Sequence, residues 1–112
     1  SAKVQDTIFM ASKIAGATAE QQTEMMQLAQ AVNAVTPLTA ADIASGQRYL
    51  AMAGNTVEQI KDMTGPAAKL ASILGQPLGG KGGVADLMTN IMSMYVIPSQ
   101  QLLRLQMIYI RL

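Results

Sequence analysis

The sequence predicts an all-α protein, in which short amphipathic helices form a bundle or a helical oligomer. Half of the residues are apolar, but the aromatic residues are only three Tyr and one Phe, so Ala, Leu and nine Met carry much of the hydrophobicity. Ala, Leu and Met are strong helix formers. Apolar residues also recur at the spacing of one helix face in several segments, and Gly or Pro separates these segments. Together these observations favour helices over strands.

The first predicted helix covers residues 2–15. Val4, Ile8 and Ala11 follow one another at intervals of four and three, which places them on one face. Gly16 is expected to end the helix, because glycine is common just past a helix C-terminus.

The second predicted helix covers residues 18–34. Thr18 and Gln21 have the spacing of a capping box, in which each side chain bonds the backbone N–H of the other residue. The helix should end before Pro37, because the residue that precedes a proline, here Thr36, is disfavoured in helical conformation.

The third predicted helix covers residues 39–53. Thr39 is expected to cap it, with the acidic Asp42 in the first turn. Gly54 and Asn55 follow, and both residue types are common in turns. A tight turn is therefore predicted between this helix and the next.

The fourth predicted helix covers residues 56–74, with Thr56 and Gln59 as a second capping box. A kink or break is expected at residues 65–66, because proline lacks a backbone N–H and collides with the preceding turn. A break would leave residues 66–74 as a short separate helix.

Residues 75–83 are predicted to be a mobile glycine-rich loop, since ordering many glycines is entropically unfavourable. Gly75, Gly80 and Lys81 have the spacing of a phosphate-binding P-loop. That motif requires Ser or Thr next, where Gly82 stands, and a preceding strand. The sequence therefore favours a hinge over a nucleotide site.

Two further helices are predicted at residues 83–95 and 99–111, separated by Pro98. The last segment is ambiguous, because its end is rich in residues with high β-propensity. Arg104 and Arg111 are seven residues apart, which places them on one face of a helix. Helix is the favoured prediction, and strand remains open.

The composition argues against an enzyme. The chain has no Cys and no His, so the usual metal ligands and the usual bases that activate a serine are missing. No cofactor is expected. A net charge of +1 provides little electrostatic attraction for a phosphate backbone, so no specific nucleic-acid binding is expected. No apolar stretch is long enough to span a bilayer.

The residues of interest are therefore those that can pack helices against each other or against partners. Small residues are expected where helix backbones come close together, and larger apolar residues are expected to pack between the helices. The candidates are Ile43, Tyr49, Leu50, Ala53, Gly54, Ile60, Met88, Met92, Tyr95, Leu103, Met107 and Ile110.

The C-terminal quarter of the chain favours self-association. After Asp86 the only charged side chains are Arg104 and Arg111, and most of the remaining residues are apolar. A chain of 112 residues forms one modest core, which is too small to bury all of these side chains. A homo-oligomer, with a trimer as one form, or insertion into a larger assembly is therefore expected.

Five segments resemble the core region of phage tail tape-measure proteins. They are LTAADIA at 38–44, YLAMAG at 49–54, TVEQI at 56–60, PAAKLA at 66–71 and ADLMTNIM at 85–92. The resemblance covers roughly residues 20–98. The sequence departs from the family pattern in the glycine-rich stretch and at residues 95–96.

The resemblance implies a structural protein of the virion tail that is assembled in the host cytoplasm. Such a protein sets tail length within the tail tube and takes part in genome ejection. Its implied partners are other copies, tail tube proteins, baseplate or tail-tip proteins and, during ejection, the host membrane. Members are usually much longer, so this chain would be a domain or a fragment. Two other functions stay open: a membrane-interacting helical protein, and a helical interaction module of a secretion-type apparatus.

Overall fold

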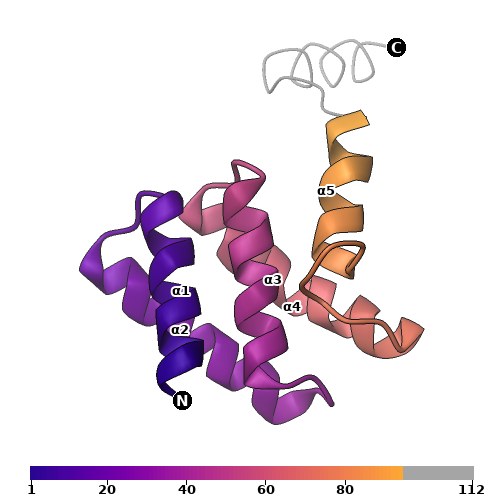
Figure 1. The fold of residues 1–112 in the computed structure, drawn as a ribbon, viewed down its shortest axis with the longest axis horizontal. Helices are drawn as coiled ribbons and strands as arrows, with labels where there is room; N and C mark the ends of the chain where they lie inside the picture. Colours follow the sequence, from indigo (N-terminus) through magenta and orange to yellow (C-terminus); the bar gives the residue numbers. More distant parts are fainter. Residues whose placement is uncertain (95–112) are drawn as a thin grey trace, which may run out of the picture.

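The computed structural model describes residues 1–94, with side chains described for residues 1–91. The described part contains five α-helices and no strand, so the predicted all-α fold is confirmed. The helices are α1 (Ala2–Ile14), α2 (Ala19–Val35), α3 (Ala40–Met52), α4 (Val57–Leu74) and α5 (Val84–Met94) (Figure 1). The helix predicted at residues 99–111 lies outside the described residues.

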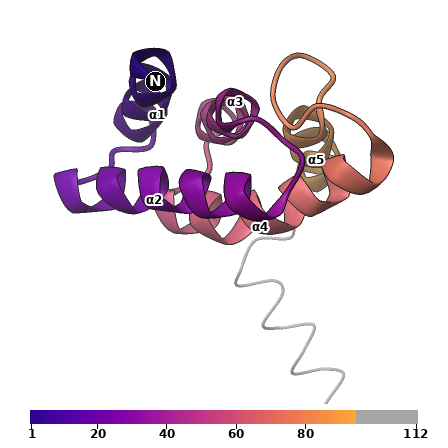
Figure 2. The ribbon, with the colours of Figure 1, turned by 90° about the horizontal axis from the view of Figure 1, so that it is seen from below.

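The helices form two layers that cross each other. Figure 2 shows α1, α3 and α5 end-on in one layer, while α2 and α4 run across beneath them. In Figure 1, α1 and α3 run in the same direction, with both N-termini at the same end of the molecule. α3 is the central helix, because it contacts α1, α2, α4 and α5.

The core between the layers is built from medium and small side chains. Its largest fully buried apolar members are Ile8, Met25, Ile43, Leu50, Ile60, Leu78 and Val84. Alanines also contribute to the core, and Ala11, Ala29, Ala44, Ala67, Ala68 and Ala71 are almost fully buried. Alanine at these positions allows short distances between helix axes, which depend on the side chains at the contact.

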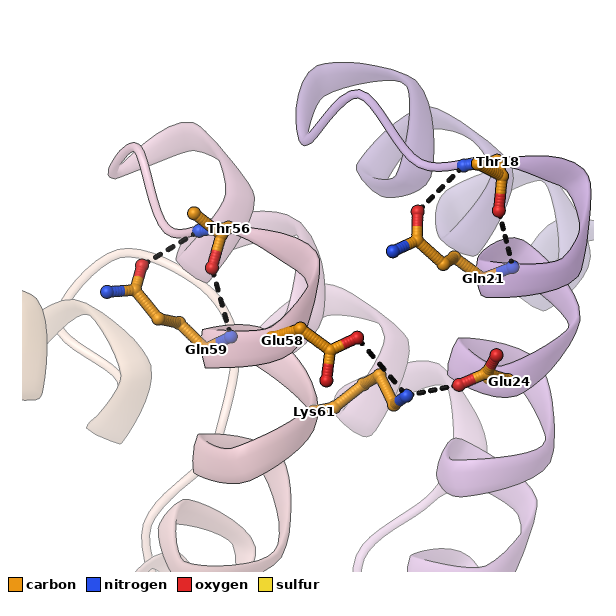
Figure 3. A network of polar contacts seen from close by, with 7 residues as sticks. All are labelled: Thr18, Gln21, Glu24, Thr56, Glu58, Gln59 and Lys61. Carbon is orange, nitrogen blue, oxygen red and sulfur yellow. Dashed lines mark hydrogen bonds and ion pairs between the residues drawn. The ribbon is translucent and has the colours of Figure 1, made fainter.

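Both predicted capping boxes are confirmed (Figure 3). The backbone N–H of Thr18 donates to Oε1 of Gln21 (2.9 Å), and the N–H of Gln21 donates to Oγ1 of Thr18 (3.1 Å). Thr56 and Gln59 form the same pair of bonds, at 2.8 and 3.2 Å. These bonds satisfy N–H groups that have no partner within the helix. Thr18 and Thr56 thus fix the residues at which α2 and α4 begin.

Of the kink or break predicted at residues 65–66, the break is wrong, because α4 continues through Pro66 as one helix. A proline disfavours helical conformation in the residue before it partly through contact with that residue's Cβ. Gly65 has no Cβ, so this contact is missing. Helical conformation at the residue before Pro66 is therefore allowed.

The glycine-rich segment at residues 75–83 packs against α3 and is not the free hinge that its composition predicts. The carboxylate of Asp42 accepts hydrogen bonds from the backbone N–H groups of Leu78 (2.7 Å) and Gly79 (3.0 Å). The Leu78 side chain is 1% exposed and belongs to the core. The segment also bonds to the start of α5, where the N–H of Val84 donates to the carbonyl of Pro77. Burial and charge-assisted bonds together offset the entropy of ordering the glycines.

Candidate interaction surface

The larger apolar residues chosen from the sequence lie mainly in the core. Ile43, Leu50 and Ile60 are at most 1% exposed. Tyr49 and Met88 are half-buried and pack against the core. Where described, these side chains hold the helices of one chain together and do not face outward.

Ala53 and Gly54 lie at the turn between α3 and α4 and are exposed. Gly54 has φ +93°, a conformation that favours glycine, so its role is in the turn. The expected part of these two residues in contacts with another chain stays a prediction. Ala44 and Ala51, on α3, are buried.

For five of the residues predicted from the sequence, the side chain is not among those described. Met92 lies in α5, but its side chain is not among those described. Tyr95, Leu103, Met107 and Ile110 lie outside the described residues.

An apolar groove lies between the C-terminal end of α2 and the second half of α4. Its volume is about 550 Å³. It is lined by Val32, Val35, Thr36, Pro37, Gly65, Pro66, Lys69, Ser72 and Ile73. The groove exists because α2 ends here and because Gly65 contributes no side chain, with open space where a Cβ would be. Lys69 is the only charged residue in the lining.

The groove has strongly exposed apolar side chains on its two sides. Val35 on α2 is 81% exposed, and Ile73 on α4 is 75% exposed. Leu70 and Leu74, which neighbour Ile73 on the same helix, are 41% and 54% exposed. A helix in a globular protein usually turns charged or polar residues to the side away from the core. Apolar side chains around a hollow are typical of surfaces that contact another protein.

The helix α5 has a second exposed apolar stripe. Leu87 and Ile91 are 49% and 56% exposed and lie one turn apart. Val84 and Ala85, at the start of the same helix, are buried. Helix α5 is thus apolar on two sides, of which one is covered by the described chain.

Val35 and Ile73 are not among the residues predicted from the sequence. The available signal was the width of the apolar stripe on α4, where Leu70, Ile73 and Leu74 add a second set to the buried Ala67 and Ala71. One stripe is enough for an ordinary surface helix, so a second stripe indicates a second contact.

A polar contact joins α2 to α4 on the outer layer. The ammonium of Lys61 on α4 pairs with the carboxylate of Glu24 on α2, and it lies 3.5 Å from Oε1 of Glu58 (Figure 3). The hydrogen bond with Glu24 is the main reason that the pKa of Lys61 is raised. Glu58 lies three residues from Lys61 in the sequence, whereas Glu24 lies 37 residues away. These groups are solvated charges that align two helices.

The polar groups of the described residues do not assemble a metal centre. No group of three or more acidic side chains in residues 1–94 is placed to hold an ion. Among the described helices, none is both long and apolar enough to cross a bilayer.

No family model matches the chain, and no curated protein or solved structure is significantly similar to it. In the described chain, the groove between α2 and α4 is the feature that best suits a functional contact, because Val35 and Ile73 are exposed on its two sides.

Proposed function

We propose that this chain is a structural assembly protein whose helices bind other protein chains, first of all other copies of itself. The observation that carries this proposal is the apolar groove between α2 and α4, with Val35 and Ile73 exposed on its sides. Fully burying one such side chain contributes about 1.5–3 kcal/mol. Covering both sides of the groove would therefore stabilise a complex.

The specific form of the proposal comes from the family resemblance. In that form the chain is part of a phage tail tape-measure protein. It would lie within the tail tube of the virion, help to set tail length and take part in genome ejection. Its partners would be further copies, tail tube proteins and baseplate or tail-tip proteins, with host membrane contact during ejection. No catalytic step is assigned to it.

The occupant that we propose for the groove is the apolar segment 101–112 of a second copy. This segment carries Leu102, Leu103, Leu105, Met107, Ile108, Ile110 and Leu112 within twelve residues. Eighteen residues follow Met94, enough to extend well beyond the end of α5. In Figure 1, α5 runs away from the C-terminal end of α2, where the groove lies. A neighbouring copy is therefore the favoured source.

Disulfide trapping tests this contact, because the chain has no cysteine of its own. An Ile73→Cys chain and a size-tagged Ile108→Cys chain are mixed and mildly oxidised. We expect a disulfide-linked pair of the two variants. The matched control replaces Ile73→Cys by Gln27→Cys, since Gln27 is exposed on α2 outside the groove lining. Equal linking to both positions would contradict the groove as the docking site.

Analytical ultracentrifugation of the unmodified chain tests self-association as such. Oligomers are expected, and the Ile73→Lys variant should shift them towards monomers, because a charge would be buried in the contact. A stable monomer of the unmodified chain would overturn the assembly proposal. Mass spectrometry of purified tails from the source phage or prophage tests the tail assignment, which fails if the chain is absent from them.

A further inference from the structure

A glycine and a proline stand next to each other near the middle of the 18-residue helix α4, as Gly65 and Pro66. These are the two residue types that least favour a helix interior. Proline also removes one hydrogen bond of the helix, the one that the carbonyl of Asp62 would accept. The pair therefore lowers the stability of α4.

Packing within the described chain does not account for this pair. Pro66 is exposed, and Gly65 is half-buried. A Cβ atom on Gly65 would meet no atom of another described element within 4 Å. Gly46 on α3 is the contrasting case, because Leu78 occupies the space beside it. Gly65 eases the contact with Pro66, but no packing contact of the described residues requires Pro66 itself.

The pair leaves a space in the wall of the groove between α2 and α4. Gly65, Lys69 and Ser72 follow one another at intervals of four and three residues on one face of α4, and all three line the groove. Val32 and Val35 line it from α2. Because glycine has no side chain, the groove has room at a position where other residue types would project into it. We refer to this space beside Gly65 as the notch.

The groove lining indicates which kind of side chain would fill the notch. Val32 and Val35 offer aliphatic contacts, and Lys69 is the only charged residue of the lining. Segment 101–112 has seven Leu, Ile and Met residues and two arginines. Lys69 would repel an arginine in the groove. An aliphatic side chain of the segment therefore suits the notch, and an arginine does not.

We propose that the notch at Gly65 determines the specificity of the groove, because it receives one large aliphatic side chain from segment 101–112 of a second copy. This inference rests on the assembly proposed above. A few side chains in well-packed pockets supply most of the binding energy of an interface. A residue larger than glycine at position 65 would take the place of such a side chain.

A matched pair of variants of the full chain tests the notch. Pro66→Ala removes the steric conflict between proline and the residue before it, and it keeps the notch open. The Gly65→Leu, Pro66→Ala double variant fills the notch on the same background. In analytical ultracentrifugation we expect its dissociation constant to be at least about tenfold higher than that of Pro66→Ala, as for the loss of one buried aliphatic contact.

The stability of the monomer should change in the opposite direction. Leucine favours a helix more than glycine does, and the added Cβ has open space. The urea midpoint of the double variant, measured at a concentration below association, should therefore equal or exceed that of Pro66→Ala. Weaker association together with an undiminished midpoint separates a filled notch from a damaged fold.

Two controls locate the contact. The Gln30→Leu, Pro66→Ala variant introduces the same side chain at an exposed position of α2 outside the groove lining, and it should leave association unchanged. Alanine is also introduced singly at each of the seven aliphatic residues of segment 101–112. The truncation that weakens Pro66→Ala most should have little further effect in the double variant, because the notch is already filled.

The outcomes distinguish this inference from the assembly proposal. Oligomers that tolerate the double variant, or that Pro66→Ala alone abolishes, would overturn the notch and leave the assembly proposal in place. The same holds if Gln30→Leu weakens association as much as Gly65→Leu does. A monomeric unmodified chain would overturn both.

Discussion

Leu78 of the glycine-rich segment packs directly on Gly46 of α3. A Cβ atom placed on Gly46 would lie 2.5 Å from Cγ of Leu78, well inside contact distance. Gly46 thus creates the space on α3 that Leu78 fills. This contact, with the Asp42 bonds beside it, brings residues 75–83 into the core.

The Gly46→Ala substitution should therefore destabilise the fold, although alanine favours helix more than glycine does. We expect a loss of about 1–3 kcal/mol, which is typical of an overpacked core. Urea unfolding followed by circular dichroism measures it. Combining Gly46→Ala with Leu78→Ala should recover part of the loss, because the smaller side chain leaves room. Strict additivity of the two changes would rule out this contact.

Asp42→Asn should release the glycine-rich segment from α3. The substitution replaces a charged acceptor of two N–H groups by a neutral amide, and hydrogen bonds to charged groups contribute about 1.5–3 kcal/mol. Amide exchange at Leu78 and Gly79 should accelerate more than exchange in the α1 helix. Asp62→Asn, which changes an exposed carboxylate on α4, is the control and should leave exchange at these amides unchanged.

Gln47→Met should stabilise the protein by about 1 kcal/mol. Gln47 is fully buried and its Nε2 donates to the carbonyl of Met25 (3.2 Å), while its Oε1 has no partner among the described residues. Methionine has a similar length and removes this unsatisfied acceptor. Thermal unfolding compares it with Gln27→Met, an exposed change expected to be neutral. A lower melting temperature for Gln47→Met would show that the amide is needed.

Thr56→Ala should destabilise α4 by about 1 kcal/mol, since it removes the side-chain half of a capping box. Thr18→Ala makes the same change at the start of α2 and provides a matched comparison. Chemical denaturation measures both variants. If neither variant loses stability, these caps do not contribute to the fold.

The Lys61 pairing predicts a pH effect in the alkaline range. The pKa of Lys61 is raised in the folded state above its usual 10.5, mainly by its hydrogen bond with Glu24. The contribution of this pairing to the stability of the fold is therefore fully present below pH 10.5, and it is lost as the pH rises through the folded-state pKa of Lys61. Melting temperatures of the unmodified chain and of Lys61→Met should converge over that range. A difference that stays constant across it would contradict the pairing.

The features that were predicted correctly depend on residues close together in the chain. Thr18 with Gln21 and Thr56 with Gln59 are visible because a capping box joins residues three positions apart. Helical periodicity is likewise local, and it placed Ile43, Leu50 and Ile60 on packing faces. The spacing of apolar residues does not show whether such a face packs within its own chain or against another chain.

The features that were missed join distant residues. Asp42 bonds to Leu78 across 36 positions, and Lys61 pairs with Glu24 across 37. The groove likewise needs α2 and α4 to lie side by side, with Gly65 leaving the space open between them. None of these partners could be chosen from residue types alone, because many other pairs of the same types are possible.

Local residue choice was thus enough to specify helices, caps and turns, since these arise from backbone sterics and from neighbours within one or two turns. The packing of the five helices decided which apolar side chains are covered, and it left Val35 and Ile73 exposed beside a groove. It also turned a glycine-rich stretch into an ordered part of the core. The physical reason is that burial and hydrogen bonding between distant segments depend on where the helices meet, which only the assembled chain establishes.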